Sequence, residues 1–178
     1  MASDLAPSVD LAPMRLITIL NHCQHFPGFV YEKARLRPDR GTIEIHVRPR
    51  HGSKPICSGC HAPAAGYDHL TLRRFEFVPL WGFIVLLLYR MRRVDCTACG
   101  VRVEELPWAI GKHQLTKAYM LFLAHWARKL SWQETATAFR SSWDKVRQAV
   151  EYADSGDRGQ GFRLIADSDS DPSRTAFR

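Results

Sequence analysis

The sequence carries CSGC at residues 57–60 and CTAC at residues 96–99, and these two stretches decide the fold. Each Cys-x-x-Cys turn aims two sulfurs at one point, which is how structural zinc sites obtain four ligands in a tetrahedron. Gly59 within the first turn and Gly100 just after the second permit backbone angles that other residues avoid. We therefore predict one structural zinc ion per chain, with the ligands Cys57, Cys60, Cys96 and Cys99.

The 35 residues between Cys60 and Cys96 form a longer spacer than a compact zinc site usually has. Residues 71–78 and 83–94 have the composition of two strands, joined by Pro79-Leu80-Trp81-Gly82. An antiparallel hairpin returns the chain to its starting point, so the spacer is predicted to be a β-unit clamped by the metal. Further strands are predicted at residues 42–48 and 101–106.

Other uses of the cysteines fit less well. Two redox Cys-x-x-Cys motifs would each need a thioredoxin-like βαβ context, and none is indicated. A zinc deaminase would need His-x-Glu upstream of its cysteines, and no His here is followed two residues later by Glu. Four thiolates also close the coordination shell that catalytic zinc leaves open. His61 and His69 remain alternative ligands.

The charge distribution indicates a polyanionic partner. The formal net charge is +7, and residues 1–14 and 151–178 each contribute −2, so residues 15–150 carry +11. Nucleic acid and an acidic membrane surface both attract such a segment. The basic clusters lie on predicted strands and turns rather than on one amphipathic helix, which favours double-stranded DNA.

The sequence also indicates the cellular compartment of the protein. Its first residues lack the basic region and apolar core of a secretory signal, and its longest strongly apolar run is Phe83–Tyr89, seven residues. About 20 apolar residues are needed to span a bilayer. We therefore expect a cytoplasmic, nucleoid-associated protein without a membrane partner.

From Leu115 onward the apolar residues recur with helical spacing. Thr116 can cap a first helix, and Ser131-Trp132-Gln133-Glu134 is a capping box that opens a second helix through Phe139. Ser142 can cap a third helix, from Trp143 to about Tyr152. This layout is typical of a helix-turn-helix, although a plain three-helix bundle gives the same periodicity.

The turn between the second and third helices departs from the common pattern. Glycine usually stands where Arg140 is found, and a positive φ at an arginine costs about 1 kcal/mol. The third helix is predicted to place exposed side chains on base edges: Ser142, Trp143, Asp144, Arg147 and Gln148. Basic side chains are predicted to contact phosphates: Arg73, Arg74, Arg90, Arg92, Arg93 and Lys145.

Together these patterns predict an α+β chain of two domains. A small antiparallel β zinc-binding domain is expected over residues 14–110, with a short helix near its start. An all-α, three-helix helix-turn-helix domain is expected over residues 111–153. Residues 1–13 and 154–178 lack periodicity and are predicted to be disordered.

The chain resembles the ISL-three family of bacterial insertion-sequence transposases over about residues 14–152. The resemblance rests on the strand end at residues 46–50, the two cysteine pairs, Arg73-Arg74-Phe75, Leu80, and the stretch of residues 89–100. It continues through Leu115–Ala118 and Ser142–Val146. It implies that the zinc and helix-turn-helix modules bind the terminal inverted repeats of a transposon.

Transposases of this family also have a ribonuclease-H-like domain with Asp, Asp and Glu, and this chain departs there. Only 26 residues follow Tyr152, and their acids Asp154, Asp157, Asp167, Asp169 and Asp171 cluster in low-complexity sequence. We therefore expect a non-enzymatic, DNA-binding portion of a truncated transposase. A stand-alone zinc and helix-turn-helix transcription regulator is the alternative, and homo-oligomers or association with full-length transposase stay open.

Overall fold

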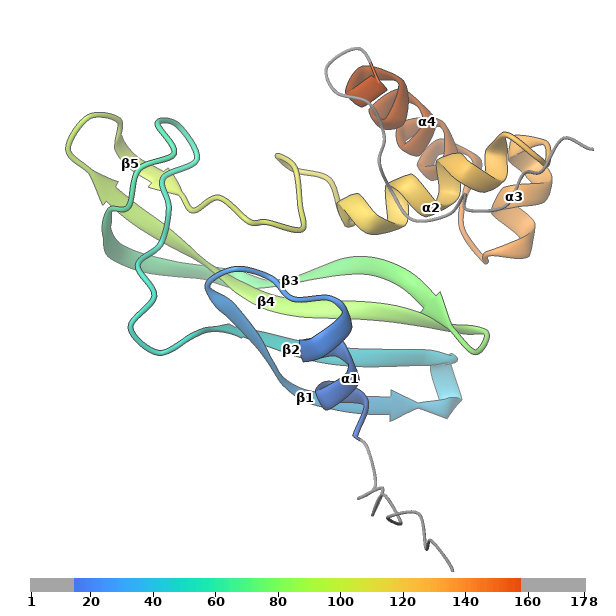
Figure 1. Ribbon diagram of the computed structural model, residues 1–178, viewed down its shortest axis with the longest axis horizontal. Helices are drawn as coiled ribbons and strands as arrows, with labels where there is room; N and C mark the ends of the chain where they lie inside the picture. Colours follow the sequence, from blue (N-terminus) through green and yellow to red (C-terminus); the bar gives the residue numbers. More distant parts are fainter. Residues whose placement is uncertain (1–14, 158–178) are drawn as a thin grey trace, which may run out of the picture.

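Residues 15–157 are described by the computed structural model, and they form a mixed α+β fold (Figure 1). The strands are β1 (Phe29–Arg37), β2 (Thr42–Pro49), β3 (Ala65–Leu80), β4 (Phe83–Cys96) and β5 (Gly100–Val103). The helices are α1 (Leu16–Cys23), α2 (Lys117–Ala127), α3 (Trp132–Ala138) and α4 (Trp143–Asp157), with a short 3-10 turn η1 (Pro38–Arg40). The predicted α+β class is confirmed. The disorder predicted for residues 1–13 and 158–178 lies outside the described residues.

The five strands form one sheet in the order β1-β2-β4-β3, with β5 paired to β4. β2 and β4 run parallel, whereas the other neighbouring strands are antiparallel. The prediction of a wholly antiparallel unit is therefore wrong. Two chain reversals, the loop 50–64 and the turn at Trp81–Gly82, separate β2 from β4, so these two strands point the same way.

Strand β1 has no counterpart among the sequence-based predictions. It pairs with β2 along its length, but a bulge between Tyr31 and Lys33 shifts the register. Beyond the bulge β1 is mostly exposed and carries several charges. Strict period-two alternation is the pattern by which a half-buried strand is recognised, and the bulge interrupts it.

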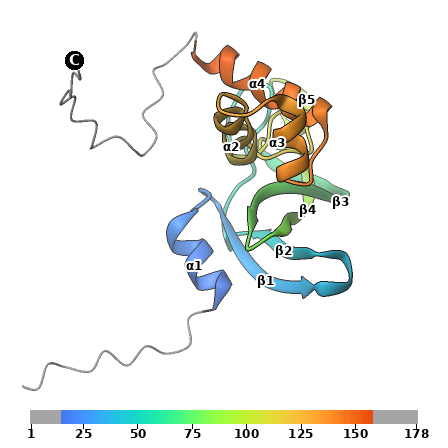
Figure 2. The same cartoon turned by 90° about the vertical axis from the view of Figure 1, so that its right-hand side faces the viewer.

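One face of the sheet packs around Trp108, which is only 1% exposed. Its indole lies 4.8–6.2 Å, between ring centroids, from Phe26, Phe29, Phe75 and Tyr89. Helix α1 and the segment 104–109 cover this face and add Leu20 and Leu106 to the same core (Figure 2). This core fixes the long strand β4, which ends at Cys96.

Helices α2, α3 and α4 share a second apolar core that includes Leu123, Ala136, Val146 and Ala149. Helix α4 continues to Asp157, so residues 154–157, predicted to be disordered tail, are helical. Ala153 is 6% exposed and extends the buried stripe of α4, which gives this last turn a packing partner.

The predicted helix starts are confirmed by their caps. The Thr116 hydroxyl accepts a hydrogen bond from the Tyr119 N–H at the start of α2. Ser131 and Glu134 form the complete capping box at the start of α3. Each cap satisfies backbone donors that the first turn of a helix leaves unpaired.

The helical region is joined to the sheet along the edge of β3. The backbone N–H of Glu76 donates to Gln114 O at 2.7 Å, and the N–H of Thr116 donates to Glu76 O at 2.9 Å. The Lys145 ammonium of α4 lies 2.5 Å from the Glu76 carboxylate. The Arg73 guanidinium donates to the carbonyl of Lys112 at 3.0 Å. The chain before α2 is therefore held against the sheet.

Candidate metal centre and nucleic-acid interface

The first cysteine pair lies in the loop between β2 and β3. The Cys57 N–H donates to Ala62 O at 2.8 Å, and the His61 N–H donates to Cys57 O at 2.9 Å. The Gly59 N–H points at the Cys57 sulfur at 3.4 Å. A side chain at Gly59 would place its Cβ only 3.1 Å from the Cys99 sulfur, so a larger residue would require this sulfur to move by a few tenths of an ångström.

The second pair lies on the β4–β5 hairpin. Cys96 is the last residue of β4 and pairs with Gly100, the first residue of β5. Gly100 has φ of +68°, which glycine adopts without cost. The β3–β4 hairpin brings the ends of the long spacer together, since Ala65 pairs with Asp95. The predicted return of the chain is therefore confirmed.

The four cysteine sulfurs gather at one point. All lie within 4.8 Å of one another, and the sulfurs of Cys60 and Cys96 are 3.5 Å apart. Tetrahedral zinc with bonds of about 2.3 Å requires sulfurs about 3.8 Å apart. Cys57 and Cys96 are buried, with Val94 in the same small cluster. Four cysteines so arranged can bind a metal ion, and the donor set is consistent with zinc.

Backbone N–H groups create an uneven electrostatic environment among these thiols. Hydrogen bonds from the N–H groups of Cys60 and Gly59 lower the pKa of Cys57 to about 7. The hydrogen bond with the side chain of Cys60, followed by burial, raises the pKa of Cys99 to about 12. A turn that stabilises one thiolate in advance is suited to metal coordination, because thiolates are the ligating form.

His61, an alternative ligand in the sequence, has a different partner. Its Nδ1 lies 2.7 Å from Glu105 Oε2, and this hydrogen bond raises the pKa of His61. His61 also adopts a positive φ of 59° within the turn. Among residues 15–157, the cysteines form the only group of three or more metal-ligating side chains.

The side chains predicted to reach base edges lie at the start and on the outer surface of α4. The Ser142 hydroxyl accepts from the Lys145 N–H at 3.4 Å and so caps the helix. Trp143 is 46% exposed, and its ring lies 5.4 Å from that of Trp132. Asp144 is exposed on the same turn. These residues surround the exposed beginning of α4.

Arg147 and Gln148 follow one turn later, and both have protein partners. The Arg147 guanidinium lies 2.6 Å from the Glu151 carboxylate and 3.9 Å from that of Asp144. The Gln148 Oε1 lies 3.3 Å from Nδ1 of His113. Arg147 is thus flanked by its own helix, whereas Gln148 faces the segment before α2.

The structure divides the basic residues predicted to contact phosphates. Arg74 and Arg90 are exposed. Arg73 binds backbone carbonyls of the 112–113 segment and lies over the Phe75 ring. Arg93 pairs with the Asp68 carboxylate, with Nε 2.6 Å from Oδ1. Lys145 is paired with Glu76 across the junction described above.

Arg92 has become part of a buried network that the sequence did not indicate. Glu104 is 2% exposed and accepts hydrogen bonds from the Tyr89 hydroxyl at 2.6 Å, the Arg92 N–H at 2.7 Å and Arg92 Nε at 2.8 Å. The Arg92 side chain is only 12% exposed. The alternation of residues 101–106 gives no sign that Glu104 turns inward.

The turn after α3 contains a non-glycine residue with a positive φ. Arg140 has φ of +52°. Its N–H donates to Thr137 O at 3.3 Å, and the Ser141 N–H donates to Ala136 O at 2.8 Å, which is a Schellman ending of a helix. Arg140 therefore adopts the positive φ that a glycine usually supplies at this place.

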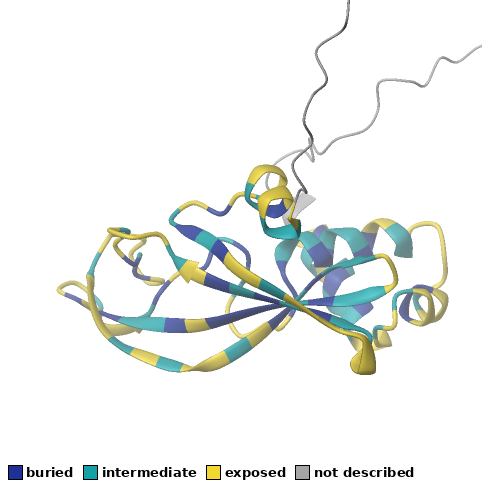
Figure 3. Cartoon of the chain, turned by 90° about the horizontal axis from the view of Figure 1, so that it is seen from below, coloured by how far each residue is buried: buried dark blue, intermediate teal, exposed yellow. Residues whose placement is uncertain are grey.

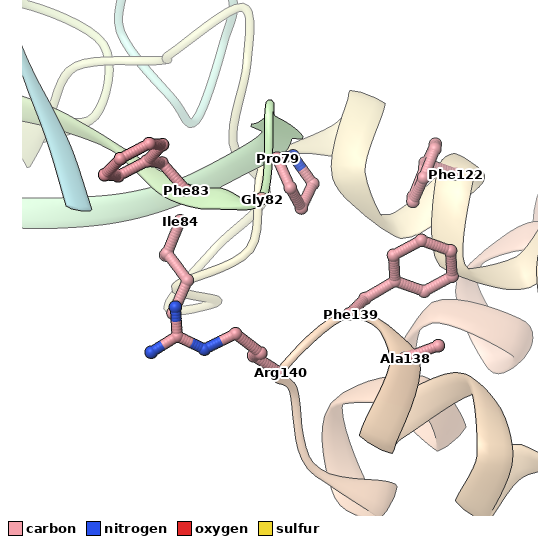
Figure 4. A pocket seen from close by; sticks show the side chains of 8 residues that line it. All are labelled: Pro79, Gly82, Phe83, Ile84, Phe122, Ala138, Phe139 and Arg140. Carbon is pink, nitrogen blue, oxygen red and sulfur yellow. The ribbon is translucent and has the colours of Figure 1, made fainter. Parts of the chain in front are cut away.

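Arg140 also reaches toward the sheet. Its guanidinium lies close to Gly41, because a Cβ built at Gly41 would be 2.8 Å from Arg140 Nη1. Phe139, Phe122 and Pro79 line a cavity of about 240 Å³ between this turn and the β3–β4 hairpin (Figure 4). The turn and the β3–β4 hairpin thus lie on two sides of one cavity.

Comparison with known proteins finds one informative similarity. The chain is 27% identical over 123 residues to the transposase for insertion sequence element IS1001 of Bordetella parapertussis. The match covers 67% of this chain and 30% of that protein. This similarity supports a transposase-related origin, whereas membership of the ISL-three family specifically is not shown.

Two further comparisons bear on the chain. No protein-family model matches it, and no solved structure matches it. Within residues 15–157, no helix is both long enough and apolar enough to cross a bilayer.

Proposed function

We propose that the chain binds the terminal repeats of an insertion sequence, as the DNA-binding portion of a transposase. The observation that carries the proposal is the arrangement of α3, a four-residue turn and α4 in a chain similar to a transposase. Helix α4 begins at the surface with polar and aromatic side chains, as a helix that enters the major groove must. The excess of basic residues supplies the general attraction to DNA.

The three helices have the packing that a helix-turn-helix requires. The small Ala136 of α3 lies in the same core as Val146 and Ala149 of α4, and α2 completes this core with Leu123. Residues 139–142 form the turn, with the Schellman ending of α3 and the Ser142 cap of α4. We assign α4 as the recognition helix. One side of α4 packs into the core through Val146 and Ala149, and the other side stays outside the core and is available to DNA.

The ion pairs of Arg147 do not prevent base recognition. Pairs between residues three or four apart on an exposed helix surface contribute about 0.3–0.5 kcal/mol. A good bidentate contact of arginine with guanine contributes about 1–3 kcal/mol of discrimination. The base contact is therefore the stronger interaction, and it can replace the two ion pairs of Arg147.

We also propose that one zinc ion joins the β2–β3 loop to the β4–β5 hairpin. Its ligands would be Cys57, Cys60, Cys96 and Cys99. Four thiolates complete a tetrahedral shell, so the ion would stabilise structure without an open position for substrate.

The sequence-specificity proposal is tested with Arg147→Ala and a charge-matched control, Arg128→Ala, in the exposed segment after α2. We expect Arg147→Ala to lower the preference for the element's end sequence over random DNA by about 5- to 150-fold, the equivalent of 1–3 kcal/mol. Binding to random DNA should change little. Equal losses on both DNAs, or the same loss of preference in Arg128→Ala, would contradict the assignment. No preference of the wild-type chain for any terminal repeat would favour the transcription-regulator alternative.

We propose that the chain binds DNA without cutting it. Two-metal nucleases need a cluster of carboxylates, and the described residues contain no group of three or more ligands besides the cysteines. Incubation of the full chain with end-sequence DNA and magnesium or manganese should therefore leave the DNA intact in a denaturing gel. Metal-dependent nicking that persists through purification, and that is absent from a mock preparation, would overturn the non-enzyme proposal.

A further inference from the structure

The sheet has a second face, opposite the Trp108 core. In Figure 3, α1 lies over the core side, and no helix covers the other face of β1 and β2. Strand register identifies the side chains on this open face, because directly paired residues point to the same side of a sheet. Lys33 pairs with His46, His46 with Leu88, and Leu88 with Arg74. These four residues form one row across the sheet.

The neighbouring rows repeat this composition. Arg35 pairs with Glu44 on the same face, and Arg37 pairs with Thr42. Arg48 is two residues beyond His46 on β2, and Arg90 is two residues beyond Leu88 on β4. The open face is defined here by six exposed basic residues: Lys33, Arg35, Arg37, Arg48, Arg74 and Arg90.

Few acids offset this charge. Glu44 lies 3.5 Å from Arg37, and the Glu76 carboxylate is bound by Lys145 of α4. Arg48 has only a long contact of 3.8 Å, with Glu32. Within residues 15–157, no carboxylate lies within 4.0 Å of the side-chain nitrogens of Lys33, Arg35, Arg74 or Arg90. These four cations are available to an external anion.

The pKa of His46 reflects burial and the positive electrostatic potential at the centre of the open face. Burial, followed by the charges of Lys33 and Arg35, lowers the pKa of His46, and the opposing effects of Glu32 and Glu44 are smaller. Leu88, which is paired with His46 on the neighbouring strand β4, is only 5% exposed. Long basic side chains cover apolar surface with their stems and leave the charged ends in water. The face is therefore cationic at its surface over a partly apolar floor.

We propose that this open face is a second DNA-contacting surface, which binds the phosphate backbone and does not read bases. Four strands spaced about 4.8 Å apart place Lys33 and Arg74 about 14 Å from each other, a distance comparable to the rise of about four base pairs of duplex DNA. Isolated cations on flexible stems bind phosphates as point charges and carry no sequence information. The inference rests on the proposed function, and it adds basic residues of β1 and β2 to Arg74 and Arg90, for which the sequence already predicts phosphate contacts.

The test compares two double variants of the full, zinc-loaded chain. Lys33→Ala with Arg35→Ala removes two cations of the open face. Arg40→Ala with Arg50→Ala removes the same charge from exposed loop residues at the two ends of β2, off the sheet face. Circular dichroism and zinc content should be unchanged in both variants. The readout is the affinity for end-sequence and random DNA at several salt concentrations.

We expect Lys33→Ala with Arg35→Ala to weaken binding to both DNAs equally, on the order of tenfold, and to reduce the slope of log affinity against log salt by about 1.8. The loop variant should show a much smaller change in slope. Equal slope changes in the two variants would overturn the inference. A wild-type chain that binds DNA without sequence preference would overturn the proposed function alone, since the slope comparison still tests the open face.

Discussion

Replacing Cys96 with Ser is expected to lower the free energy of unfolding by more than about 3 kcal/mol and to abolish stoichiometric zinc binding. Structural zinc sites contribute apparent binding free energies of about 10–16 kcal/mol at neutral pH, and loss of one ligand forfeits much of this. The cysteine cluster is separate from the Trp108 core and has only Val94 and Ala64 as apolar support. We therefore expect the proposed zinc ion to stabilise the loop 50–64 in addition to its backbone hydrogen bonds, such as that from the Glu105 N–H to Ile56 O at 2.8 Å.

The fifth cysteine provides a matched control for this prediction. Cys23 is exposed at the end of α1, so Cys23→Ser should leave both stability and zinc content at wild-type values. Elemental analysis of the wild-type chain should give close to one zinc per chain. Absence of zinc, together with a circular dichroism spectrum that chelation does not change, would refute the metal centre.

Replacing Glu104 with Gln is expected to cost about 3–5 kcal/mol of stability. The substitution removes the negative charge that compensates the largely buried Arg92 guanidinium, and breaking a buried ion pair on one side leaves an unpaired charge. It also weakens the acceptor of the Tyr89 hydroxyl, which lies in the Trp108 core. The measurement is denaturant unfolding followed by Trp fluorescence.

The neighbouring residue Glu105 provides the control variant for this prediction. Glu105 is exposed and contacts only the surface residue His61, so Glu105→Gln should cost less than about 1 kcal/mol. A value for Glu104→Gln within 1 kcal/mol of wild type would show that the Arg92 guanidinium does not depend on the charge of Glu104. In that case Arg92 would again be free to serve as a phosphate contact.

Local chemistry explains which features could be predicted from the sequence. A Cys-x-x-Cys turn and a capping box depend on residues two or three positions apart, so the spacing alone carries the information. The place of Arg140 after α3 pointed to a turn that usually contains glycine, and the structure shows that Arg140 adopts the positive φ of that turn. The hairpin between the cysteine pairs was predictable because β3 and β4 are long and adjacent in sequence.

The features that the sequence did not reveal depend on distant partners. Arg73, Arg92 and Arg93 belong to similar basic stretches as Arg74 and Arg90, but three of these five are held by groups elsewhere in the chain. Arg92 meets Glu104, and Arg73 meets the carbonyl of Lys112, 39 positions away. The alternation of residues along a strand does not indicate which arginine side chain turns toward the protein, because that depends on the segment packed against the strand.

The parallel pairing of β2 with β4 was hidden for the same reason. The loop 50–64, the strand β3 and the turn at Trp81–Gly82 all lie between β2 and β4, and parallel pairing has no turn sequence of its own. The open face became visible only through this pairing, because it aligns the basic residues of β1 with those of β3.

The most direct test of the account is selection of binding sites by the zinc-loaded wild-type chain from a library of random duplex DNA. The account predicts enrichment of one motif that also occurs at the ends of the insertion sequence, and loss of this enrichment in Arg147→Ala. Enrichment should persist, with weaker overall binding, in Lys33→Ala with Arg35→Ala. Recovery of no motif at all, from a chain that holds zinc and is folded, would contradict sequence-specific DNA binding by this protein.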